Sequence, residues 1–218
     1  SEWLINTFNG KKCHDTVYVC ANPMYRHINF DPPFYDIVDV WENSWDNDLH
    51  TVHPEDMRKA TIQAAKEYEN KRVLSHWLQP HYPFISDDAV VHASVDKNKI
   101  NIWNELIRKT SDHQPANVID SYRANLEPVL KSVKSIFEVI QGRIVVTADH
   151  GNMLGERATP IPTPEWGHPP GVYTDGLVDV PWHVYENGKR RETIAEKGEH
   201  EDATHENVEE RLADLGYV

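Results

Sequence analysis

The stretch QGRIVVTADHG, residues 141–151, decides the expected fold of this chain. Gly142 ends an amphipathic helical pattern, and the β-branched run that follows at once is typical of a buried strand. The run stops at an acid and an imidazole, Asp149 and His150, which are expected at the tip of that strand. A helix that passes directly into an apolar strand indicates the alternating order of an α/β fold.

The same alternation extends toward the amino terminus. The preceding helix is predicted from apolar residues at three- and four-residue spacing, and Pro128 is expected to kink it. Periodicity and turn residues predict the remaining elements of this half. They are a helix over 1–8, strands over 16–20 and 35–41, a helix over about 54–70, a strand from 72, a helix near 100–108 and the long helix over about 117–140.

Beyond the opening stretch, the Pro- and Gly-rich residues 157–171 are expected to form no regular structure. A strand is predicted over 179–187 and a helix over 206–218, ended by Gly216. Strands that alternate with helices imply a mostly parallel sheet covered on both faces. Residues 1–218 are therefore predicted to be a single α/β domain, with ligands at the carboxyl ends of its strands.

The composition excludes several classes of partner. The formal net charge is −13 and the isoelectric point is about 5.4, so no basic stripe is present to neutralise nucleic-acid phosphates. No apolar stretch approaches the roughly 20 residues that span a bilayer. No signal peptide is visible, which predicts a cytoplasmic location. The two cysteines, Cys13 and Cys20, form neither a disulfide framework nor a CxxC metal motif.

Asp149 and His150 are the first candidate metal ligands. A carboxylate oxygen and an imidazole nitrogen together suit a divalent ion such as Zn²⁺, Mn²⁺ or Mg²⁺. Adjacent side chains at a strand end usually point apart, so both reach one ion only where the chain turns sharply, and Gly151 permits such a turn. The alternative is an aspartate that caps the next helix beside an incidental histidine.

Three further histidines lie in rigid loops. In HWLQPHYPF, residues 76–84, His76 and His81 stand on either side of a proline break, and His168 lies between Gly167 and a Pro-Pro-Gly loop. Histidines in a cleft bind anions, act as acids or bases, or ligate metals. The alternatives are a core histidine bonded to backbone for His76 and a surface-loop histidine for His168.

Taken together, these segments resemble the alkaline phosphatase/sulfatase superfamily. The resemblance is carried by RIVVTADHGNMLGE (143–156), WGHPPGVYTDGLVDVPWHV (166–184), HWLQPHYPF and the terminal VEERLADLGYV, in the family's order. It is closest to the sulfatase-like hydrolases of archaea and more distant to lipoteichoic acid synthase-type enzymes. The resemblance implies a three-layer α/β/α sandwich with a mostly parallel central sheet.

The resemblance also implies roles for the candidate residues. Asp149 and His150 would ligate a divalent ion, namely Mn²⁺, Zn²⁺, Ca²⁺ or Mg²⁺. His168 would act in catalysis at the transferred sulfuryl or phosphoryl group or its leaving oxygen. His81 and His76 would bind the anionic ester substrate, for which a glycan or a lipid-linked group is a candidate. Neither the substrate nor the oligomeric state follows from these motifs.

One part of the family pattern is missing. Family members begin with a strand that carries acidic ligands, followed by a nucleophile at the start of a helix. This chain shows no such strand before Ser1, so Ser1 is the candidate closest to the nucleophile position, and no C-x-P-x-R motif of formylglycine sulfatases is present. The resemblance thus implies a metal-dependent hydrolase of phosphate or sulfate esters that needs this segment to be supplied. The alternative is a non-catalytic relative that binds an anionic glycan or a protein.

Overall fold

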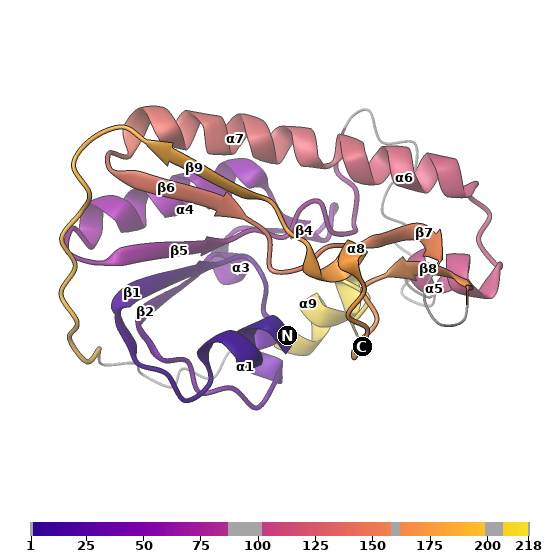
Figure 1. Ribbon diagram of the computed structural model, residues 1–218, viewed down its shortest axis with the longest axis horizontal. Helices are drawn as coiled ribbons and strands as arrows, with labels where there is room; N and C mark the ends of the chain where they lie inside the picture. The colour runs from indigo at the N-terminus through magenta and orange to yellow at the C-terminus, as the bar shows by residue number, and fades with distance from the viewer. Residues whose placement is uncertain (1, 87–101, 158–161, 199–206, 218) are drawn as a thin grey trace.

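A computed structural model describes residues 2–86, 102–157, 162–198 and 207–217 (Figure 1). The first half contains α1 (Glu2–Phe8), β1 (Cys13–Cys20), α2 (Met24–His27), β2 (Phe34–Asp39), α3 (Val40–Asn43), β3 (Trp45–Asp46), β4 (Thr51–Val52), α4 (Pro54–Glu67) and β5 (Arg72–His76). The second half contains α5 (Ile102–Arg108), α6 (Pro115–Ala124), α7 (Leu126–Val139), β6 (Arg143–Thr147), β7 (Met153–Arg157), β8 (Pro164–Gly167), α8 (Asp175–Val178), β9 (Trp182–Glu186) and α9 (Val208–Asp214). The fold is mixed α/β. None of the helices within these ranges is both long and apolar enough to cross a membrane.

A parallel sheet of three strands, in the order β2-β1-β5, forms the centre of the amino-terminal half. The prediction of a mostly parallel sheet is confirmed for these three strands, whereas the other described strands pair antiparallel. The register places Cys20 of β1 opposite Asp39 of β2 and opposite His76 of β5. The carboxyl ends of all three strands therefore lie at one edge, and His76 is the last residue of its strand at that edge.

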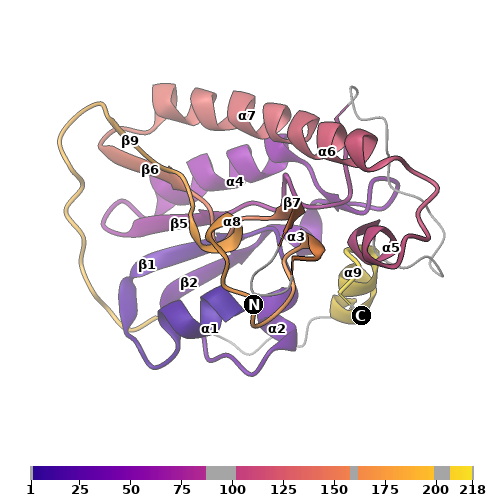
Figure 2. The ribbon, with the colours of Figure 1, turned by 45° about the vertical axis from the view of Figure 1, so that its right-hand side comes forward.

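The two faces of this sheet pack against different helices. Along β1, Val17 and Val19 belong to the core formed with α4, whereas Tyr18 and Cys20 belong to the core formed with α1 and α2. All four side chains are fully buried, as the alternation of side chains along a central strand requires. Figures 1 and 2 show α4 and α1 on opposite sides of the sheet. Tyr18 and Cys20 thus bring polar atoms into an otherwise apolar layer.

The remaining described strands form three antiparallel pairs: β3 with β4, β6 with β9 and β7 with β8. The prediction that residues 157–171 form no regular structure is wrong at β8. Pro164 stands at the first position of that strand, where a residue without an N–H is tolerated. The expectation that the β6 run is buried is also wrong, because Val145 is 36% exposed. Among the described strands, β6 pairs on one side only.

The long helix predicted over 117–140 is broken into α6 and α7 at Asn125. Pro128, three residues later, cannot donate a backbone hydrogen bond, and its ring clashes with the carbonyl one turn earlier. The helix is therefore interrupted before Pro128, and α7 starts at Leu126. The buried Asn125 side chain donates to the carbonyls of His81 and Pro83 and accepts from the Ile85 N–H. The kink predicted from Pro128 is a break between two helices, and Asn125 at that break holds the loop that carries His81.

After β9, residues 187–198 return along one end of the molecule toward β1 (Figures 1 and 2). Lys71 anchors this segment. Its buried ammonium lies 3.0 Å from the Glu196 carboxylate and 2.8 Å from the Ile194 carbonyl oxygen, and above the Tyr35 ring. The connection ties the β6–β9 pair to the edge of the sheet opposite the carboxyl ends of its strands.

Candidate functional site

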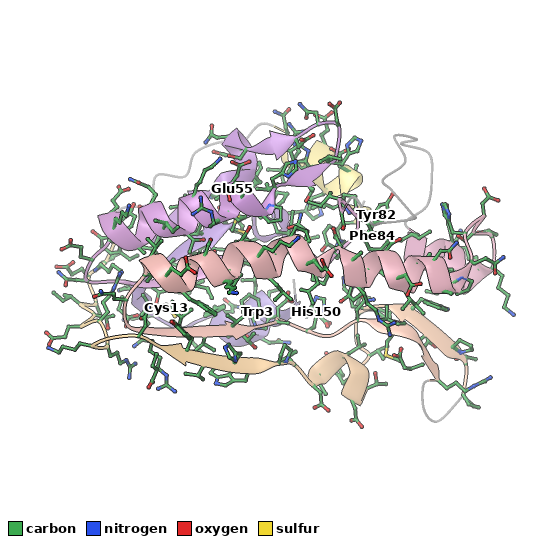
Figure 3. The ribbon with its side chains drawn as sticks, turned by 90° about the horizontal axis from the view of Figure 1, so that it is seen from above. Trp3, Cys13, Glu55, Tyr82, Phe84 and His150 are labelled. Carbon is green, nitrogen blue, oxygen red and sulfur yellow. The ribbon has the colours of Figure 1, made fainter. Side chains whose placement is uncertain are left out.

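The carboxyl ends of β5 and β6 meet, although these strands belong to different sheets. His76 ends β5, and Asp149 follows β6 by two residues. His76 Nε2 lies 3.6 Å from Asp149 Oδ2, and His150 Nε2 lies 3.5 Å from the same oxygen. The structure therefore brings two imidazoles, one from β5 and one from the residue after Asp149, close to the Asp149 carboxylate. Figure 3 shows His150 near the middle of the long axis of the molecule.

Asp149 does not cap a helix, because the next described element is the strand β7. Its Oδ1 accepts the His150 backbone N–H at 3.0 Å. The other oxygen, Oδ2, faces the ring nitrogens of His76 and His150. The helix-capping alternative is thus wrong, and the two adjacent side chains do lie on the same side of the chain.

Gly151 permits this arrangement for a different reason from the one expected. A Cβ atom there would lie 2.0 Å from the Gly176 carbonyl oxygen and 3.3 Å from the Leu177 Cα. The Gly151 N–H donates to the Leu177 carbonyl at 2.8 Å. Only a residue without a side chain fits against the α8 backbone, so Gly151 is required by close packing.

His150 is held in one orientation by its backbone. Its Nδ1 lies 2.8 Å from the Gly151 carbonyl oxygen. A carbonyl oxygen can only accept, so Nδ1 carries a proton, and in the neutral ring the Nε2 lone pair faces Asp149 Oδ2. Two electron-rich atoms that face each other in this way favour a cation between them.

His81 is fixed in the same manner by the loop that follows β5. Its Nδ1 donates to the Tyr82 carbonyl oxygen, and its Nε2 is buried with no hydrogen-bond partner in the described part of the chain. The ring packs against Tyr217 with centroids 5.4 Å apart and against His168 with centroids 5.3 Å apart. His81 therefore presents an acceptor nitrogen next to His168.

His168 is not the surface-loop residue that its sequence alone allowed. Its ring stacks on His150 with centroids 4.4 Å apart, and its Nδ1 lies 3.3 Å from the Asn152 amide oxygen. The preceding Gly167 adopts a φ of 75°, which favours glycine, and packs against Trp103. This turn directs the chain from β8 into the cluster.

One pattern is shared by His81, His150 and His168. Each ring bonds through Nδ1 to an oxygen acceptor, which leaves Nε2 as the nitrogen available for chemistry. Histidines that ligate metals are held in this way, because the second hydrogen bond fixes the tautomer and the ring orientation. The arrangement suits metal binding or proton transfer at Nε2.

Asp149 and His76 each stabilise the charged form of the other. Burial alone would raise the pKa of the Asp149 carboxyl, but the neighbouring His76 and His150 rings outweigh burial and hold it below its ordinary value. Burial likewise lowers the pKa of His76, yet the Asp149 carboxylate and the Cys20 side chain together outweigh this effect and raise the pKa to about 10. At neutral pH the pair is an imidazolium next to a carboxylate.

The other two histidines behave in the opposite way. Burial lowers the pKa of His81. Burial, reinforced by His81 and His150, lowers the pKa of His168 to about 3. Both rings are therefore neutral at physiological pH, and both keep a lone pair for a ligand or a proton.

The low pKa of His168 gives a prediction about stability. Between a folded pKa of about 3 and an unfolded value of 6.5, unfolded His168 binds a proton that the folded ring does not. The free energy of unfolding of metal-free protein should thus fall by about 2 kcal/mol between pH 7 and pH 5 through this residue. Urea unfolding of His168→Asn should show a flatter pH profile than wild type. The exposed His113→Asn is the matched control, and equal slopes for all three proteins would contradict the prediction.

The fit of a divalent ion is incomplete. No group of three or more His, Cys, Asp or Glu side chains in the described ranges is arranged to hold a metal ion. Asp149 and His150 nevertheless present an oxygen and an imidazole nitrogen 3.5 Å apart, close enough for two bonds of about 2.0–2.2 Å to one ion. These two residues would hold the ion, and further ligands would have to come from elsewhere.

Sequence reasoning missed three residues of this site. Tyr18 bonds to His76, Asn152 bonds to His168, and Asn125 holds the His81 loop. Tyr18 offers a weak signal, since its hydroxyl interrupts a run of apolar strand residues. Asn125 and Asn152 carry no signal, because their partners lie far away in the sequence or in an unrelated loop. Ser1, the candidate nearest to the nucleophile position, lies outside the described residues.

Comparison with known protein families, with characterised proteins and with solved structures finds no match to this chain.

Proposed function

We propose that this chain is a sulfatase-like member of the alkaline phosphatase/sulfatase superfamily and a metal-dependent hydrolase of phosphate or sulfate esters. The single observation that carries the proposal is the convergence of one carboxylate, Asp149, with imidazoles whose Nε2 atoms are left available. The residues of that cluster are the same ones that the motif resemblance singles out.

The chemistry of the cluster suits an anionic ester. A bound divalent ion would neutralise charge on the ester oxygens. His168, anchored at Nδ1 by Asn152, would accept at Nε2 the proton that the attacking nucleophile loses and would then pass it to the leaving oxygen. His81 is neutral in the free protein, but an anion bound beside it would raise its pKa and convert Nε2 into a donor. His168 would thus transfer protons, whereas His81 would bind the anion.

The nucleophile and the remaining metal ligands would come from a segment outside the described residues. Among the described strands, β5 pairs only with β1 and β6 pairs only with β9. A strand between β5 and β6 would join the two sheets into the central sheet of a three-layer sandwich. It would also end beside Asp149, because both flanking strands end there.

The test is to assay this chain, and a form extended at its amino terminus, with aryl phosphates, phosphodiesters and aryl sulfates in Mn²⁺ or Zn²⁺. Metal content is measured by elemental analysis. We expect bound metal and turnover of at least one ester class by the extended form. His168→Asn should lower turnover by about 100-fold, because it removes the proton-transfer group. The exposed His113→Asn is the control.

The outcomes are distinct. Absence of both bound metal and turnover with all three ester classes would contradict the proposal. Binding of an anionic glycan without turnover would instead identify a non-catalytic relative. Equal turnover by His168→Asn and wild type would remove His168 from the mechanism.

A further inference from the structure

A buried chain of polar side chains leads from β1 to the candidate site. The Cys20 thiol lies 3.2 Å from the Tyr18 hydroxyl, which lies 2.6 Å from His76 Nδ1. On the other side of the ring, His76 Nε2 faces Asp149 Oδ2 at 3.6 Å. Cys20 also interacts with the Asn22 backbone, whose carbonyl oxygen lies 3.0 Å from its sulfur. These hydrogen-bonded side chains connect the interior of the sheet to Asp149.

The chain lies in a layer that otherwise contains apolar rings. Tyr18 and Cys20 are fully buried, Tyr18 stacks on Phe34, and Trp3 packs edge-on against His76. A hydroxyl buried in such a layer loses its hydration, and it is tolerated only when hydrogen bonds replace the lost water. His76 and Cys20 are the partners that satisfy the Tyr18 hydroxyl.

His76 Nε2 carries a proton whether the His76 ring is neutral or protonated. If His76 is neutral and Tyr18 donates to Nδ1, the ring proton must be on Nε2. If His76 is an imidazolium, Nδ1 donates to Tyr18, Tyr18 donates to Cys20 and Cys20 donates to the Asn22 carbonyl. In both states Nε2 carries a proton that faces Asp149.

We infer that Tyr18 and Cys20 are positioning residues, which orient His76 so that its Nε2–H holds Asp149 in place. His76 would then act on the site through Asp149, and both of its nitrogens are occupied by protein groups. The inference deepens the proposed function, because its effect on metal binding depends on Asp149 being a ligand. The orientation of His76 itself does not depend on that function.

The experiment compares wild type with Tyr18→Phe, which removes only the hydroxyl. Tyr25→Phe is the matched control: Tyr25 is buried in the same layer and bonds to Asp39. Long-range ¹H–¹⁵N correlation spectra of the histidine rings report which nitrogen of His76 carries the proton. Titration calorimetry with Mn²⁺ and with Zn²⁺ reports affinity.

We expect wild type and Tyr25→Phe to show a protonated Nε2 in His76. Tyr18→Phe should shift the His76 Nδ1 signal, because Nδ1 loses its hydrogen-bond partner, and should weaken metal binding by about 10-fold, as expected when the partner of a ligand is disturbed. Unchanged His76 signals in Tyr18→Phe would overturn the inference. If the extended form binds no metal while the His76 signals respond to Tyr18→Phe, the proposed function is contradicted and the positioning role stays supported.

A second pair of variants keeps the test decisive if Tyr18→Phe does not fold. Cys20→Ala removes the group that ties the Tyr18 hydroxyl, whereas Cys20→Ser retains a hydrogen-bonding atom. Cys20→Ala should shift the His76 signals in the same direction as Tyr18→Phe, and Cys20→Ser should restore them. Identical spectra for Cys20→Ala and wild type would overturn the inference.

Discussion

Asp149→Asn is expected to weaken the binding of Mn²⁺ or Zn²⁺ by more than about 100-fold, since replacing a ligand costs at least as much affinity as disturbing its partner. The amide keeps the size of the side chain but removes the negative charge that faces His76 and His150. In the metal-free protein, the His76 imidazolium loses its counter-charge. The free energy of unfolding should therefore also fall, by about 1 kcal/mol after allowance for the partial exposure of the pair.

Calorimetric titration and urea unfolding measure the two effects separately. Asp120→Asn is the matched control, because Asp120 is an exposed aspartate that lies 3.9 Å from Arg123 and outside the cluster. The control should bind metal as wild type does. Equal metal affinity of Asp149→Asn and wild type would exclude Asp149 as a metal ligand and would thereby contradict the proposed function.

Gly151→Ala is expected to cause the largest loss of stability among the site substitutions. The new methyl group would lie 2.0 Å from the Gly176 carbonyl oxygen, which is well inside van der Waals contact. Backbone cannot turn away as a side chain can, so α8 or the Asp149–His150 turn must shift. We expect the free energy of unfolding to fall by about 3 kcal/mol, at the upper end for overpacking. Metal affinity should fall with it, because Gly151 follows both candidate ligands.

Gly10→Ala separates this steric effect from the usual cost of replacing a glycine. Gly10 has a φ of 71°, and apart from its chain neighbours no atom of the described residues lies within 4 Å of the position where a Cβ would lie. Its substitution should cost only about 1 kcal/mol, through backbone conformation. Urea unfolding of both variants measures the difference. Equal stability of the two variants would show that α8 does not pack against Gly151 as described.

Most of the strands and helices near the site could be predicted from local patterns. The periodicity of β1, β5 and α4 and the glycine stop before β6 are local signals, because alternation and helical spacing are properties of neighbouring residues. The strand β8 was missed because its pairing with β7 lies between two turns and includes Pro164. Its stability comes from contacts such as Trp166 against Gly155, which no local pattern predicts.

The candidate site divides in the same way. The five residues Asp149, His150, His76, His81 and His168 could be selected from their motifs. Their hydrogen-bond partners could not, since each ring is anchored by a group whose position depends on the path of the backbone. Tyr18 reaches His76 only because β1 and β5 pair in one register.

By itself, the sequence determined the mixed α/β class, the parallel pairing of β1, β2 and β5 and the identity of the polar residues at the strand ends. These follow from side-chain spacing and from the chemistry of acids and imidazoles. Only the tertiary structure decided that Gly151 is required by close packing and that three imidazoles bond through Nδ1. The physical reason is that packing and hydrogen bonding depend on distances between segments that the sequence separates by tens of residues.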